Sequence, residues 1–114
     1  MLKVDILARR RPDQTHDQFL THWRDVHAEL FSSQPIVKKT VRRYIQSRTV
    51  VDYPKGVVPA DVDGIAQLWF DDMDGWLEYL NSDNYRDVIR LDEQKFVDAS
   101  RVQIVFSEET TIMG

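Results

Sequence analysis

The apolar and polar positions of the chain alternate first with the period of a strand and then with the period of a helix. Residues 2–9 alternate apolar and charged side chains, which is typical of a half-buried strand. Thr15 and Gln18 then have the spacing of a capping box at a helix start. Pro35 lies where this helix is expected to end. The predicted helix has one apolar face, formed by Phe19, Trp23, Val26 and Leu30.

The rest of the chain predicts three more strands and a second, interrupted helix. A loop is expected over residues 52–63, which contain Pro54, Gly56 and Pro59. Asp74 is expected to cap a short helix, and a second helical segment is expected to begin at Ser82. The strands are predicted from β-branched, aromatic or alternating residues at 40–50, 64–70 and 101–107.

This order of elements, β-α-β-β-α-β, predicts the ferredoxin-like plan of the α+β class. We expect one domain over residues 1–114, with a four-stranded antiparallel sheet and the helices on one face. The other face is expected to carry apolar residues that no helix covers. Such a face needs a partner, so we predict a homodimer with a two-fold axis.

Composition narrows the classes of function. The net charge is −4, which disfavours nucleic acid as a partner because phosphate binding needs a basic footprint. The chain has no cysteine, so thiolate catalysis and cysteine-based metal sites are excluded. No apolar run approaches the roughly 20 residues that span a bilayer, and the first residues do not resemble a signal peptide. We therefore predict a cytoplasmic protein without a membrane partner.

Histidine is the side chain that titrates nearest neutral pH, and all three histidines, His16, His22 and His27, lie in or beside the first predicted helix. His22 and His27 are five residues apart, or about 140° around an α-helix. They lack the i, i+4 spacing of a helical metal pair, so no metal site is predicted. His27 lies beside the apolar face, where it either bonds a backbone carbonyl or acts as a general acid or base in a pocket.

Other side chains are candidates for the same pocket. The Tyr44 hydroxyl can hold a substrate oxygen, although strand packing alone would also explain a tyrosine there. Trp23 and Trp69 are candidate apolar walls, or ordinary core residues. Asp63 either sets a turn or orients a histidine. His22 is a candidate supporting residue for ligand binding.

Four segments together resemble the EthD-like family of the dimeric α/β-barrel superfamily. They are residues 22–30, the pair Arg43-Tyr44, residues 63–70 and residues 92–98. The resemblance implies a barrel of two facing sheets and neither a metal nor an organic cofactor. It also implies that His27 is the catalytic base and Tyr44 its partner. Methylmuconolactone isomerases of this group also use a cysteine in their pocket, and this chain has no cysteine.

Three hypotheses about function follow. The first is a cofactor-independent lyase or isomerase, dehydratase- or cyclase-like, which acts on a small cyclic or aromatic-like carbonyl compound by proton transfer through His27. The second is a non-catalytic protein that binds a hydrophobic ligand or assists a catabolic pathway. The third, ranked lowest, is a haem-degrading monooxygenase, since the helix motif does not resemble that group.

Overall fold

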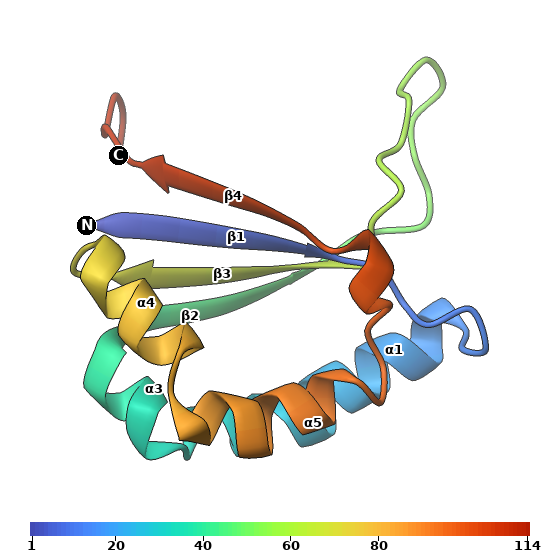
Figure 1. Ribbon diagram of the computed structural model, residues 1–114. Helices are drawn as coiled ribbons and strands as arrows, with labels where there is room; N and C mark the ends of the chain where they lie inside the picture. Colours follow the sequence, from blue (N-terminus) through green and yellow to red (C-terminus); the bar gives the residue numbers. More distant parts are fainter.

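A four-stranded antiparallel sheet forms one layer of the molecule and the helices form the other. The computed structural model describes residues 1–114. The strand order is β2-β3-β1-β4, and Figure 1 shows β1 and β3 at the centre of the sheet. This arrangement confirms the predicted ferredoxin-like fold. The strands are β1 (Leu2–Ala8), β2 (Val41–Arg48), β3 (Gly64–Phe70) and β4 (Gln103–Glu108).

The helices follow the strands in the predicted order, and two of them contain a π-helical turn. The first long helix consists of α1 (His16–His22), the π turn η1 (Trp23–His27) and α2 (Ala28–Ser32). The short helix α3 (Pro35–Thr40) follows it. The second half contains α4 (Met73–Leu80), the π turn η2 (Tyr85–Ile89), α5 (Arg90–Glu93) and a 3₁₀ turn (Ala99–Arg101).

The helix starts agree with the sequence in two cases and correct it in two. Ser82 begins the predicted second helical segment, and its hydroxyl accepts from the Tyr85 amide at 3.0 Å. Thr15 and Gln18 form the predicted capping box. Pro35 not only ends the first helix but begins α3, because proline fits the first turn of a helix, where its missing N–H has no intrahelical partner. The N-cap of α4 is Asp72, whose side chain accepts from the Gly75 amide, and not Asp74 as predicted.

The π turn η1 decides which side chains of the first helix are buried. In an ideal α-helix, residues four apart in sequence differ by about 40° in direction around the helix axis. A π turn contains more residues than an α turn. The wider turn therefore keeps such positions on one face. Val26, predicted to face the core, is 47% exposed. The buried positions are instead Phe19, Trp23, His27 and Phe31.

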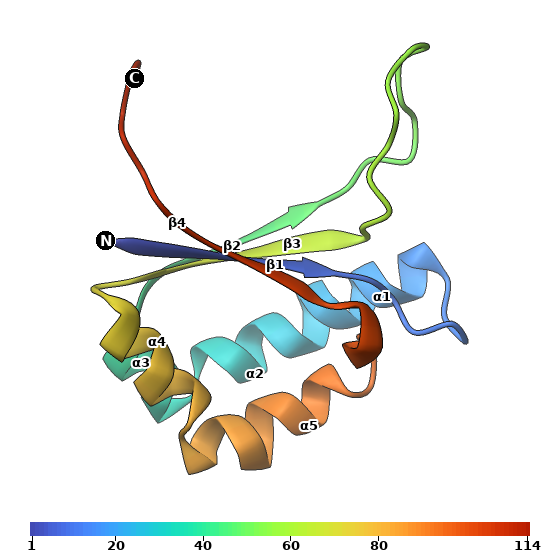
Figure 2. The ribbon, with the colours of Figure 1, turned by 45° about the horizontal axis from the view of Figure 1, so that its top comes forward.

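All helices cover the same face of the sheet, as Figure 2 shows. Leu68 and Phe70 of β3 point toward the helices and belong to the main core, together with Val4 of β1. Trp69, between them in sequence, points to the opposite face, where Lys3 and Arg43 lie over its ring.

The face without helices differs in composition from the prediction, because it is mixed and not mainly apolar. Lys3 and Asp5 form an ion pair on it, and Ser47 donates to Gln67 there. Alternation along the strands places these polar side chains beside apolar ones, such as Val105 opposite Asp5.

The connection between β2 and β3 is long and irregular. Residues 49–63 form no helix or strand, as predicted for 52–63, and in Figure 2 they project from the sheet on the side away from the helices. None of the helices combines the length and the apolar character that crossing a bilayer requires.

Candidate functional site

A cavity of about 280 Å³ lies between the sheet and the helices. Sixteen of its twenty lining residues are hydrophobic, which is the usual character of a small-molecule site. The other four lining residues are His27, Arg90, Glu93 and Gln94, and tyrosine hydroxyls among the sixteen add further polar groups, those of Tyr44, Tyr79 and Tyr85.

His27 is held by a buried carboxylate from the second half of the chain. Its Nδ1 lies 2.8 Å from Oδ2 of Asp92, and Asp92 is only 3% exposed. The other oxygen of Asp92 lies 3.0 Å from Nε2 of His22. An ionised carboxylate only accepts hydrogen bonds, so both imidazole rings donate to it. In the neutral form of His27, the Nε2 atom is therefore free of the proton that its Nδ1 carries.

The structure thus brings His22 and His27 together, although an ideal α-helix would separate them. The π turn η1 begins directly after His22 and includes His27, and it reduces the angle that five residues span. Asp92 also has two oxygens, so one carboxylate reaches both rings. Phe96 supports the pair, with its ring 4.7 Å from His22 and 5.0 Å from His27. No group of three or more His, Cys, Asp or Glu side chains is arranged as a metal site.

The charges of this pair are fixed by burial and hydrogen bonding. Burial lowers the pKa of His27, and the hydrogen bond and charge of Asp92 offset only part of that effect. Burial raises the pKa of Asp92, but the bonds from His27 and His22 outweigh it and leave this pKa below its ordinary value. At neutral pH the pair therefore consists of a neutral imidazole and an ionised carboxylate, as a general base requires.

Tyr44 reaches the cavity from β2 and keeps a proton that it can donate. Its oxygen accepts a hydrogen bond of 2.8 Å from Nε2 of Gln46, and the same nitrogen donates to the backbone oxygen of Trp23 at 3.0 Å. The hydroxyl proton has no acceptor within the chain. Burial raises the pKa of Tyr44 to about 12, although hydrogen bonds with Gln46 and Trp23 act to lower it. The hydroxyl therefore stays protonated.

The helical segment formed by η2 and α5 contributes another acid, Glu93, to the cavity. The Tyr85 hydroxyl donates to Oε1 of Glu93 over 2.7 Å. Burial raises the pKa of Glu93 above its ordinary value, whereas hydrogen bonds from two imidazoles leave the pKa of its neighbour Asp92 below its ordinary value. The adjacent carboxyls therefore differ in environment, since one meets two imidazoles and the other meets a phenol.

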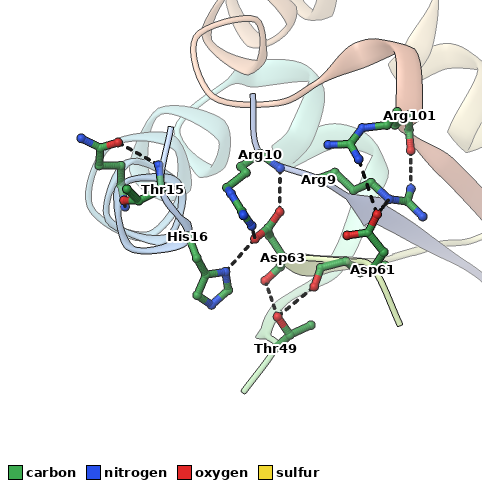
Figure 3. A network of polar contacts seen from close by, with 10 residues as sticks. Arg9, Arg10, Thr15, His16, Thr49, Asp61, Asp63 and Arg101 are labelled. Carbon is green, nitrogen blue, oxygen red and sulfur yellow. Dashed lines mark hydrogen bonds and ion pairs between the residues drawn. The ribbon is translucent and has the colours of Figure 1, made fainter. Parts of the chain in front are cut away.

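Of the other candidates, Trp23 lines the cavity, whereas Asp63, Trp69 and His22 do not. Asp63 accepts from the Arg10 amide at 2.8 Å and from His16 at 2.7 Å, as Figure 3 shows. The alternative that Asp63 orients a histidine thus holds for His16, not for His27. Burial raises the pKa of Asp63, but these bonds and the Arg10 side chain lower it overall. Its role here is to hold the end of β1 to the start of β3.

Asp92 and Glu93 were predicted only as part of the segment 92–98 that resembles the family, and no role was predicted for Gln46 or Tyr85. Asp92 and His27 are 65 residues apart, so no local spacing links them. Gln46 follows Tyr44 by two positions and so shares its face of the strand, which is the one signal that could have identified it.

The comparison with known proteins agrees with this fold. The family model described as the EthD domain matches residues 11–100. No curated protein matches the chain. Among solved structures, an EthD-family protein from Bacillus halodurans is similar, with a TM-score of 0.69 and 20% identity over 96% of this chain and 100% of its own.

Two further structures share the fold at lower identity. One, described as a dimeric protein of ferredoxin-like fold from Bacteroides fragilis, has a TM-score of 0.67 and 14% identity, over 95% of each chain. A dabb-family protein from Mesorhizobium loti has a TM-score of 0.62 and 12% identity, over 96% of this chain and 97% of its own. Because the EthD domain model matches most of the chain, this protein belongs to the EthD family.

Proposed function

We propose that the protein is a cofactor-independent lyase or isomerase that removes a proton next to the carbonyl group of a small cyclic or aromatic-like compound. The observation that carries the proposal is the His27–Asp92 pair at an apolar cavity. A neutral imidazole whose Nδ1–H is fixed by a carboxylate presents Nε2 as a base. The apolar surroundings favour this neutral form.

Tyr44 complements the base. When His27 removes a proton from the carbon beside a carbonyl group, negative charge develops on the carbonyl oxygen. The free proton of the Tyr44 hydroxyl stabilises that charge by a hydrogen bond, and Gln46 holds the hydroxyl in place. His22 shares the Asp92 carboxylate and so limits its movement.

The cavity limits the size and character of the compound. A volume of about 280 Å³ suits one ring or two fused rings. Trp23, Phe31 and Phe96 supply aromatic surface around it. Few polar groups are available to bind a highly charged compound.

The proposal is tested by exchange of hydrogen for deuterium in D₂O, with the bicyclic ketone 2-tetralone as the probe. We expect the protein to accelerate exchange at the carbons beside the carbonyl. Since general base catalysis contributes about 10²–10⁴-fold, His27→Gln should slow exchange at least about 100-fold. His16→Gln is the matched control, because His16 does not line the cavity.

The outcomes separate the two leading functions. Exchange that is unchanged in a folded His27→Gln variant would remove His27 from the mechanism. If 2-tetralone binds in the cavity without any exchange above the buffer rate, the protein is a ligand-binding protein instead.

We also propose a homodimer that pairs the sheet faces without helices. No element of the chain covers this face (Figure 2), which still carries apolar residues such as Val105 at 46% exposure. A similar structure is itself described as dimeric. Sedimentation as a monomer at micromolar concentration would contradict this proposal.

A further inference from the structure

Glu93 is an ionisable group of the cavity that the proposed proton abstraction does not use. It is the last residue of α5 and lines the same cavity as His27. Tyr85 donates to its Oε1 over 2.7 Å, while no hydrogen bond within the chain reaches its Oε2. One oxygen is therefore fixed and the other is available to a bound compound.

The groups around Glu93 come from four elements, and their balance favours the protonated acid. Burial is the largest effect and raises the pKa of Glu93; the charge of Asp92 adds to it, while Tyr85 and Arg90 act in the opposite direction. Tyr44 of β2 and Tyr79 of α4 also interact with the Glu93 charge. Burial keeps both of these phenols neutral, so only Arg90 brings a positive charge.

Glu93 and His27 thus have the complementary properties of an acid and a base in one cavity. A pair of ionisable groups whose environments push their pKa values apart is the usual arrangement for acid and base roles. We propose that Glu93 is the proton donor of the cavity and returns a proton to the compound from which His27 has removed one. This inference rests on the proposed function and adds a second catalytic residue to it.

The two transfers balance. His27 Nε2 takes the proton beside the carbonyl, and the electron pair of that C–H bond moves into the enolate. The electron pair then returns through the conjugated system to form a new bond to the proton of the Glu93 carboxyl. Glu93 is left ionised and regains a proton from solvent, while His27 loses its proton to solvent. The compound has lost one proton and gained another at a different atom.

The experiment compares two probes that differ in this second transfer. Deuterium exchange into 2-tetralone needs only a base, whereas conversion of 3-cyclohexen-1-one to 2-cyclohexen-1-one also needs a proton delivered to a distant carbon. We expect Glu93→Gln to lower the ratio of isomerisation to exchange at least about tenfold, within the range of general acid catalysis. Glu29→Gln is the matched control, since Glu29 is exposed on α2 and outside the cavity.

A second measurement does not depend on turnover. Carboxyl NMR titration of the folded protein should show a pKa of Glu93 above that of an ordinary glutamate. Tyr85→Phe should raise it further, because the Tyr85 hydrogen bond lowers it. A purely packing role for Tyr85 would leave this titration unchanged.

The outcomes distinguish the inference from the proposed function. His27-dependent exchange with an unchanged ratio in Glu93→Gln would overturn the role of Glu93 alone, and so would an ordinary pKa for Glu93. Absence of any His27-dependent exchange would overturn both.

Discussion

Gly64 is the position where one added methyl group should disturb the cavity most directly. A Cβ atom built there would lie 2.5 Å from Cζ3 and 2.8 Å from Cη2 of the Trp23 ring. Trp23 is 4% exposed, packs against Phe19 at 5.6 Å between ring centres and lines the cavity. The indole therefore cannot accept a methyl group without moving.

The size of the effect follows from the required movement. Carbon atoms in good contact lie about 3.5–4.0 Å apart, so the Trp23 ring must shift by about 1 Å. Overpacking of this kind costs about 1–3 kcal/mol, and the gain from replacing glycine within a strand offsets about 0.5–1 kcal/mol. We expect Gly64→Ala to lower the free energy of unfolding by about 1–2 kcal/mol.

Urea denaturation followed by circular dichroism measures this change. Gly75→Ala is the matched control, because its Cβ would meet only ordinary contacts, the nearest at 3.6 Å. A double-mutant cycle with Trp23→Phe identifies the cause. If the Trp23 ring is responsible, Gly64→Ala should cost at least about 1 kcal/mol less in the Trp23→Phe background.

A Gly64→Ala variant as stable as the wild type, or one that costs the same free energy of unfolding in both backgrounds, would refute a steric clash with Trp23. A functional consequence follows as well, since a displaced Trp23 changes the wall of the cavity. Binding of 2-tetralone should therefore weaken in Gly64→Ala and not in Gly75→Ala.

Three further predictions concern the buried charges. Folding lowers the pKa of His27 below 6.5, so His27 binds a proton more readily in the unfolded state. The free energy of unfolding of the wild type, relative to that of His27→Gln, should therefore fall as the pH drops below 6.5. Denaturation at pH 7.5, 6.5 and 5.5 measures this difference, and an increase toward low pH would contradict it. Asp92→Asn removes the carboxylate whose hydrogen bond and charge raise the pKa of His27, so NMR titration should show that pKa lowered further, and an unchanged value would mean that the bond is not formed in solution. Asp63→Ala breaks the hydrogen bonds to Arg10 and His16, and each buried hydrogen bond to a charged group is worth about 1.5–3 kcal/mol. The variant should therefore have a lower melting temperature and an unchanged pKa of His27 by NMR titration. A shift in the pKa of His27 would show that the contacts of Asp63 and those of Asp92 are coupled.

Much of the fold was determined by local patterns that act within a few residues. Alternation predicted β1 and β4, because a half-buried strand needs apolar side chains at every second position, and a continuous apolar run predicted β3. The capping box at Thr15 and Gln18 predicted the start of α1 for an equally local reason. Helix α3 was missed, since the proline that ends one helix also suits the first turn of the next.

The candidate site was determined by the sequence only in part. His27, Tyr44 and Trp23 were identified from their positions on predicted elements, and all three line the cavity. Trp69 was misplaced because a strand sends neighbouring residues to opposite faces, and the pattern alone did not show which face of β3 the helices cover.

What the tertiary structure alone decided is the partner of each ionisable group. Asp92 lies 65 residues from His27, and only the packing of α5 against the first helix brings them together. The π turn η1 was equally hidden, because its effect is to rotate His22 toward the carboxylate that His27 also meets. The sequence by itself therefore determined most of the elements and the place of His27 beside the apolar face, whereas long-range contacts determined that its imidazole is neutral and oriented by Asp92.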